Sequence, residues 1–236
     1  MAASRGAGVG YARGATPPVW HALALSVLAG VLCPGAAILA AASQAPADEW
    51  RLVREGDGIG VYRQTLPDAA VPRLRARGII GAPPRRVYEV VSDYDNFADF
   101  VPYVTLSRTL VRDDAASRRV HQRLRLPGPV ADREYVLRIT DFVEAAPHYH
   151  YRVQWRLDPE ATASQGPVGI VPTFFSGAWE LRDGPSPGTT EATYTIHFDP
   201  GGAVPDWLAR LGTRRMLPEV FAAVRERAQN SHARPP

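Results

Sequence analysis

Between Gly58 and Asp199 the chain consists mostly of short segments in which apolar and polar residues alternate, separated by turns rich in glycine and proline. The alternation has the two-residue period of a strand with one buried face. Successive strands joined by short turns pair in antiparallel fashion, so this region predicts a meander. We expect strands over residues 58–65, 71–80, 105–112, 118–126, 133–144, 148–157, 173–182 and 191–199.

Helical spacing replaces this alternation in the first half of the chain. A helix is expected to begin at Pro83 and Pro84, because proline fits the first helical turn. Apolar residues then recur on one helical face at Val87, Val90, Val91 and Tyr94. A second short turn or helix is expected over residues 95–102, and residues 48–55 are predicted to form a short opening helix.

The last element is predicted to be a long helix from about Pro205 to Gln229. Its apolar residues form two stripes, offset by roughly 130°, with Gly212 and Pro218 between them. Proline cannot donate a hydrogen bond to the residue four positions earlier, so a kink is expected there. The predicted fold class is α+β, a curved antiparallel sheet wrapped around a long C-terminal helix, with a gap between them for a ligand.

Residues 1–43 have the organisation of a secretory signal peptide. Basic residues precede an uncharged apolar stretch that ends near Cys33, and small residues follow. We expect cleavage after Ser43 and export, which makes the protein periplasmic or secreted. The alternative is an uncleaved membrane anchor over residues 19–42, a stretch long enough to span a bilayer.

Residues 44–230 are predicted to form a single domain, since about 190 residues suffice for one core, and residues 231–236 a disordered tail. All 27 basic residues are arginine, which we interpret as composition bias. Without the leader the opposite charges nearly balance and no basic stripe remains, so nucleic acid is not an expected partner. Cys33 is the only cysteine, which excludes a disulfide framework within the chain.

A family resemblance is carried by segments spread over almost the whole predicted domain: Trp50–Tyr62, Arg75–Ile80 before Pro83, Val87–Val91, Pro129–Val136, and Gly201–Leu208 with Pro218. They resemble segments of START lipid-transfer domains, of the helix-grip (SRPBCC) superfamily that also includes polyketide cyclases and quinone-binding proteins. The resemblance implies a helix-grip fold, a hydrophobic ligand and no metal or other cofactor. It is a pattern of spaced residues and not a catalytic signature, so it specifies fold better than function.

The candidate cavity residues are mainly aromatic and apolar side chains that share strand faces. They are Phe97, Phe100, Leu124, Tyr149, Tyr151, Val153, Trp155, Trp179, Tyr194, Ile196, Trp207 and Val220. Tyrosine and tryptophan suit a mixed cavity, because each offers apolar area and one polar group. The same faces would also suit an ordinary packed core.

The opposite strand faces carry arginines and histidines and are predicted to be solvated. An arginine turned inward could hold a phosphate or carboxylate headgroup, and Arg123 and Arg138 are the candidates. His148 and His150 stand two residues apart, but no cysteine or nearby carboxylate completes a zinc site, so no metal is expected.

The sequence contains no nucleophile elbow, phosphate loop or dinucleotide fingerprint. We therefore predict a protein without catalytic activity that binds a lipid or other hydrophobic small molecule, for transport or sensing, with contact to a membrane surface during exchange. A cyclase-type enzyme that uses the same cavity, a quinone-binding protein, and a protein whose groove takes a partner chain are the alternatives.

Overall fold

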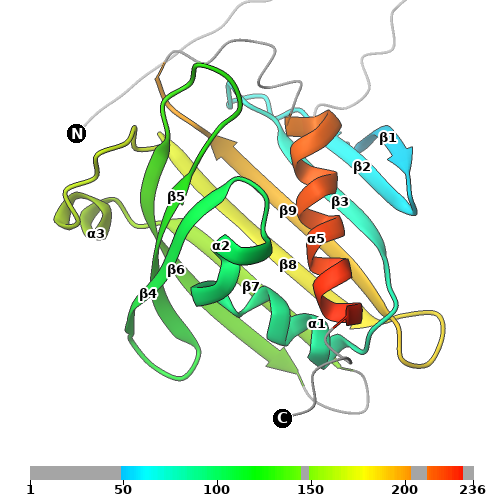
Figure 1. The fold of residues 1–236 in the computed structure, drawn as a ribbon. Coiled ribbons are helices and arrows are strands. Elements are labelled where there is room, and N and C mark those ends of the chain that lie inside the picture. Colours follow the sequence, from blue (N-terminus) through cyan, green and yellow to red (C-terminus); the bar gives the residue numbers. More distant parts are fainter. Residues whose placement is uncertain (1–48, 145–148, 203–211, 231–236) are drawn as a thin grey trace, which may run out of the picture. The chain divides into compact units, whose positions relative to one another are not determined.

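A nine-stranded antiparallel sheet forms the centre of the computed structural model, which describes residues 49–144, 149–202 and 212–230 (Figure 1). The strands are β1 (Arg51–Gly56), β2 (Ile59–Gln64), β3 (Arg73–Ile80), β4 (Val104–Arg112), β5 (Ser117–Leu124), β6 (Arg133–Glu144), β7 (His150–Leu157), β8 (Phe174–Asp183) and β9 (Thr190–Asp199). The predicted α+β fold with a curved antiparallel sheet and a C-terminal helix is confirmed.

The strand order is β1-β2-β3-β9-β8-β7-β6-β5-β4. Two meanders, β1–β3 and β4–β9, are joined through the pairing of β3 with β9, in which Leu74 lies opposite Ile196. This pairing brings the second and the last of the predicted strands side by side. The segment between β3 and β4 contains the helices α1 (Pro84–Val91) and α2 (Phe97–Phe100) and the single turn η1 (Tyr94–Asn96).

The predicted opening helix over residues 48–55 is wrong, because residues 51–56 form the strand β1. Asp57 and Gly58 both have positive φ angles, 55° and 68°. Two such residues in succession form the tight turn whose twist matches a two-strand hairpin. Gly56 consequently lies opposite Ile59, and β1 pairs with β2 as an edge strand.

The short helix α3 (Pro159–Ser164) was not predicted. The Asp158 carboxylate accepts a hydrogen bond from the Ala161 N–H at 3.0 Å, and Pro159 occupies the first turn. This is a common way to begin a helix. The helix lies beside the backbone of β6, where the Thr162 hydroxyl accepts the Val136 N–H at 2.9 Å.

The C-terminal helix α5 (Leu217–Asn230) lies across the inner face of the sheet, in front of β3, β9 and β8 (Figure 1). It follows a π-helical segment, η2 (Gly212–Met216), so the helical geometry changes close to the predicted kink. Pro218 lies in the first turn of α5, a position that proline tolerates well. The earlier part of the predicted helix lies outside the described residues.

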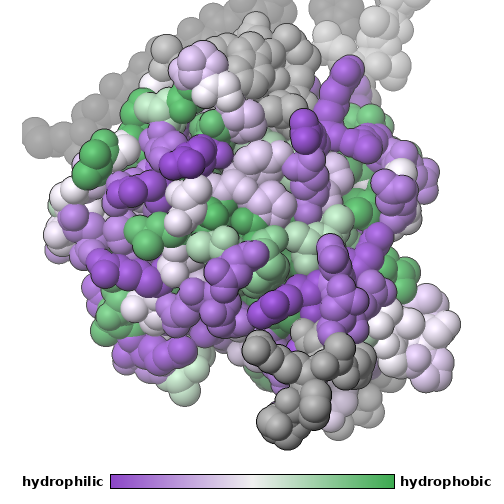
Figure 2. Space-filling model, viewed as in Figure 1, coloured by the Kyte–Doolittle hydropathy of each residue, from purple (hydrophilic) through white to green (hydrophobic). Residues whose placement is uncertain are grey.

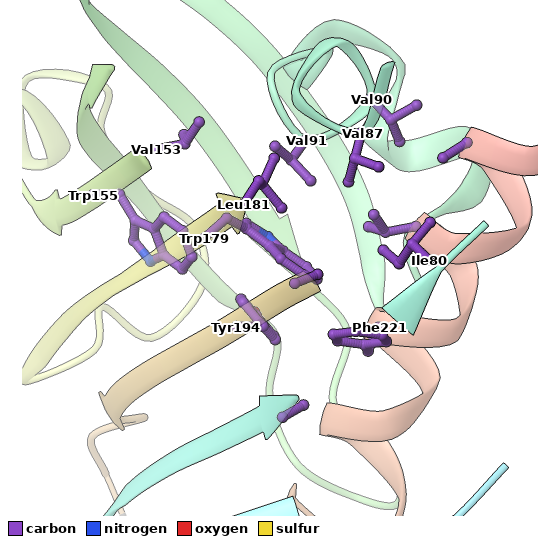
Figure 3. Close-up of a cluster of buried hydrophobic side chains, with 14 of the residues drawn as sticks. Ile80, Val87, Val90, Val91, Val153, Trp155, Trp179, Leu181, Tyr194 and Phe221 are labelled. Carbon is purple, nitrogen blue, oxygen red and sulfur yellow. The ribbon is translucent and has the colours of Figure 1, made fainter. Parts of the chain in front are cut away.

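Phe221 is the central contact between α5 and the sheet. Its buried ring lies 5.5 Å from that of Trp179 on β8, between centroids, and Val224 and Ala228 continue the buried stripe of α5. Val87, Val90 and Val91 of α1 face the same layer (Figure 3). The core is therefore densely packed where α1 and α5 meet over the strands.

Candidate ligand-binding site

A cavity of about 450 Å³ lies between the inner face of the sheet and the N-terminal half of α5. Its lining comes from β3–β9, α1, η1, α2, η2, α5 and the adjoining loops. Most of it is apolar: Leu74, Val91, Leu124, Leu137, Phe175, Ile196, Leu217, Val220 and Val224. In the space-filling view, apolar residues are visible in the middle of this face between more polar surfaces (Figure 2). A concave apolar site of this size suits a small hydrophobic ligand.

An aromatic wall closes the cavity on the side of the sheet. Trp155, Trp179 and Tyr194 come from the neighbouring strands β7, β8 and β9 (Figure 3). The rings of Trp179 and Tyr194 stack with centroids 4.4 Å apart, and the Trp155 ring lies 5.9 Å from that of Tyr194. Each strand thus contributes one large ring to a continuous apolar surface.

Gly177 makes room for the Trp155 ring within this wall. The two residues are directly opposite in the pairing of β7 with β8. A Cβ atom at position 177 would press against the indole and lie 2.6 Å from the Thr195 carbonyl oxygen. A side chain here would therefore displace the indole or separate β8 from β9.

Three polar groups at the cavity have no described hydrogen-bond partner. They are the hydroxyls of Tyr94 and Tyr194 and the buried indole N–H of Trp155. Burial raises the pKa of both hydroxyls far above the usual tyrosine value, so they remain neutral. The two hydroxyls offer hydrogen bonds to an uncharged polar group in a largely apolar space, whereas the indole nitrogen is shielded from that space.

Gln122 and Tyr135 form a second polar pair in the lining. The Tyr135 hydroxyl donates to Gln122 Oε1 at 3.4 Å, and the Gln122 amide donates to Ser107 Oγ at 3.1 Å. Burial raises the pKa of Tyr135 well above its ordinary value. No arginine or histidine belongs to the described cavity lining, and Asp199 is its single carboxylate.

Arg118 and Asp141 form a buried ion pair on the inner face beside the α1 end of the sheet. The Tyr88 hydroxyl also donates to Asp141 at 3.0 Å, and the Arg118 guanidinium lies 5.5 Å from the Tyr94 ring centroid. The carboxylate thus neutralises the guanidinium, and the pair adds no uncompensated charge near the cavity.

Arg133 connects the loops at the other end of the cavity. Its side chain is fully buried. It donates to the carbonyl oxygens of Pro200 at 2.7 Å and Gly201 at 2.9 Å, and to that of Ala131. Burial lowers the pKa of Arg133 from the ordinary arginine value. Because Pro200 and Gly202 line the cavity, Arg133 fixes the position of this loop end.

The structure brings together seven of the predicted site residues in the cavity lining: Phe97, Leu124, Trp155, Trp179, Tyr194, Ile196 and Val220. Trp207 lies outside the described residues. The sequence interpretation missed Tyr94, Tyr135, Leu137 and Phe175. Alternation placed Tyr135 and Leu137 on one face of a predicted strand, and their strand neighbours Gln122 and Val120 identify it as the inner face.

Four other predicted cavity residues lie outside the lining. Tyr151 is buried against Tyr88 of α1, with ring centroids 4.8 Å apart, and Val153 belongs to the packed core. Tyr149 is exposed and stacks on Tyr151, and Phe100 packs against Phe97. For Tyr151 and Val153 the physical reason is that α1 covers the first half of β7, so that part of the inner face is core.

Arg123 and Arg138 also lie outside the cavity, on the outer face of the sheet. Arg123 donates to Glu134 at 2.9 Å, and Arg138 donates to Asp158 at 2.9 Å. The expectation of an inward headgroup ligand is corrected for both residues, since strand alternation turns them away from Leu124 and Leu137.

Glu144, on the paired strand, lies 3.4 Å from Nδ1 of His150, so one carboxylate stands beside this histidine. His148 lies outside the described residues. Over the described ranges no group of three or more potential ligands could hold a metal ion. In the same part of the chain, no helix has the length and apolar character needed to cross a bilayer.

Comparison with known proteins agrees with this architecture. An uncharacterised protein of Pseudomonas aeruginosa is 25% identical over 174 residues, which cover 74% of this chain and 84% of that protein. A STAR-related lipid transfer protein from Xanthomonas axonopodis superimposes with a TM-score of 0.66 at 23% identity, over 77% of this chain and 99% of that one. Human StAR-related lipid transfer protein 5 superimposes with a TM-score of 0.70 at 14% identity, over 80% of this chain and 90% of that one.

At these identities, the similarity to the two solved structures shows that this chain shares their fold. The resemblance to START domains is thereby confirmed for the architecture. Residues 80–225 match the profile of the family described as "Polyketide cyclase / dehydrase and lipid transport", which covers more than half of the sequence. The chain therefore belongs to the polyketide cyclase/dehydrase and lipid transport family.

Proposed function

We propose that the protein binds a lipid or a similar hydrophobic molecule in the 450 Å³ cavity and carries it or senses it outside the cytoplasm. The observation that supports this most is the combination of an apolar lining with unpaired neutral donors. Tyr94 and Tyr194 offer their O–H groups. A ligand with one uncharged oxygen, such as a hydroxyl or carbonyl, would satisfy them.

Binding accounts for the cavity better than acid–base catalysis does. A general acid or base works best with a pKa near the operating pH. The pKa values of Tyr94, Tyr135 and Tyr194 are raised by burial. The carboxylate of Asp199 accepts the Gly201 N–H at 2.9 Å at the loop end. We therefore favour a binding protein over a cyclase-type enzyme.

The most informative test of this function is native mass spectrometry of the protein purified from its own host. We expect one apolar molecule per chain, released by organic solvent. The polypeptide mass should also place the N-terminus between Ser43 and Pro46, as the leader predicts. A ligand-free chain that also takes up no lipid from vesicles would contradict the proposal.

We further propose that the loop between α3 and β8 touches the membrane during ligand exchange. Val168, at its tip, is 89% exposed, more than any other large apolar side chain among the described residues. Ile170, in the same loop, lies against Gly202 of the cavity lining. A Cβ atom added at Gly202 would be 3.3 Å from the Cδ1 atom of Ile170. An apolar tip beside the loop end would bring the cavity close to the acyl chains.

Val168→Asp is expected to slow lipid uptake from vesicles about tenfold, because a charge would oppose insertion by about 1.4 kcal/mol or more. The equilibrium affinity for detergent-solubilised lipid should not change. Val111→Asp is the matched control, an exposed valine on β4 far along the strand from the cavity. Equal uptake rates for the two variants in stopped-flow fluorescence would rule out this docking loop.

A further inference from the structure

A second hollow, of about 720 Å³, lies on the outer face of the sheet, opposite the apolar cavity. Short side chains form its floor in the two central strands: Ser176 and Ala178 on β8, and Thr195 on β9. Arginines stand on the flanking strands, Arg73 and Arg75 on β3 and Arg152 and Arg156 on β7. Because β3 and β7 are separated by three strand spacings, the two arginine rims are about 14 Å apart.

The strand register shows how the hollow arises. Arg73 lies opposite His197 of β9, which lies opposite Ser176 of β8, which lies opposite Arg156 of β7. A row that crosses the sheet therefore begins and ends with an arginine. The arginines rise on either side of the row, and the short side chains of Ser176, Ala178 and Thr195 leave room for a trough between them. The described lining also contains one carboxylate, that of Glu180.

The positive charge in this trough is only partly neutralised. Arg152 has Glu180 at 3.9 Å, and Arg138, also in the lining, is paired with Asp158 at 2.9 Å. Among the described residues, Arg73, Arg75 and Arg156 form no ion pair with a carboxylate. Arg156 even lies directly opposite Arg138 in the sheet, a like-charge pairing that costs stability. An external anion would relieve this repulsion.

Arg75 is already held in place for such a contact. Its guanidinium lies 3.8 Å from the ring centroid of Trp50, and its Nε donates to the Thr195 hydroxyl at 3.3 Å. These contacts leave its terminal nitrogens as donors. A guanidinium held by stacking loses less side-chain freedom when it binds an anion.

We propose that the hollow is a binding site for phosphate groups. Guanidinium forks match phosphate oxygens in geometry and charge. Hydroxyls of Ser176 and Thr195 on the floor and guanidiniums on both rims approach from several directions. This arrangement suits a tetrahedral, multivalent anion better than a single planar carboxylate. The phosphate belongs either to a soluble polyphosphate ester or to a lipid headgroup.

The first experiment is calorimetric titration of the full chain with inorganic tripolyphosphate. Saturable binding is expected, and the double variant Arg73→Gln/Arg156→Gln should weaken it at least tenfold. Arg182→Gln is the control: it removes one positive charge from the same sheet face, at an exposed position of β8 outside the hollow. Its affinity should stay within twofold of the unmodified chain.

A second arm identifies the source of the phosphate, with vesicles of phosphatidylglycerol and of phosphatidylcholine in a flotation assay. Tripolyphosphate binding that depends on Arg73 and Arg156 supports a soluble ligand. Flotation with phosphatidylglycerol vesicles but not with phosphatidylcholine vesicles, lost in the double variant, supports a headgroup. Absence of both kinds of binding, or an equal loss in Arg182→Gln, overturns the proposal. Uptake of hydrophobic ligand into the inner cavity should be the same in all these variants, so the two proposals fail independently.

Discussion

Replacing Arg133 by methionine is expected to lower the free energy of unfolding by about 3 kcal/mol, the largest effect on stability that we expect from one substitution in this chain. Methionine fills much of the same volume but cannot donate. The carbonyl oxygens of Ala131, Pro200 and Gly201 would each lose a buried hydrogen bond. Each such loss costs about 1–3 kcal/mol, and removal of a buried charge offsets part of the total.

Urea denaturation measures this effect as a lower midpoint with an unchanged slope. The matched control is Arg125→Met in the neighbouring loop. Arg125 is exposed and lies 3.8 Å from Asp132, an ion pair worth at most about 1 kcal/mol. A stability loss for Arg133→Met no larger than that of the control would show that the three carbonyl contacts contribute little.

The strands and their faces were predictable because the hydrophobic alternation is local. The predicted segment 133–144 coincides with β6, and the outward direction of Arg123 and Arg138 follows from the same alternation. The hairpin of β1 was also readable in principle, since Asp57-Gly58 is a strong turn signal. It was missed because residues 48–55 alone show no clear period.

The extent of the cavity could not be predicted from alternation. Tyr151 and Trp155 share one face of β7. However, α1 packs on Tyr151, whereas Trp155 borders the cavity. Which half of a strand is covered depends on where a distant helix lies. The role of Arg133 could not be predicted either. Its three partners are backbone carbonyl groups, which every residue has, so the sequence does not identify them.

Filling the cavity is expected to have the largest effect on ligand binding. Val220 projects from α5 into the lining and is only partly buried by the rest of the protein. An indole at this position would occupy space that the ligand needs. Excluding two large apolar groups from burial costs about 3 kcal/mol or more, and each 1.4 kcal/mol is tenfold in affinity. Val220→Trp should therefore weaken lipid binding at least a hundredfold.

The fold itself should tolerate this change, because the indole would replace empty space and not other side chains. Ala222→Trp is the matched control, since it adds a similar bulk to an exposed position on the same helix. In urea denaturation, the free energy of unfolding of both variants should stay within about 1 kcal/mol of the unmodified chain. The unmodified chain and the control should gain about 2.7 kcal/mol at a ligand concentration of 100 times Kd.

Titration of a fluorescent lipid into the three proteins tests the central claim most directly. The account predicts saturable binding of one lipid per chain for the unmodified protein and for Ala222→Trp, and loss of that binding in a stably folded Val220→Trp. Undiminished binding by Val220→Trp would contradict it, because the lipid would then be held somewhere other than the cavity beneath α5.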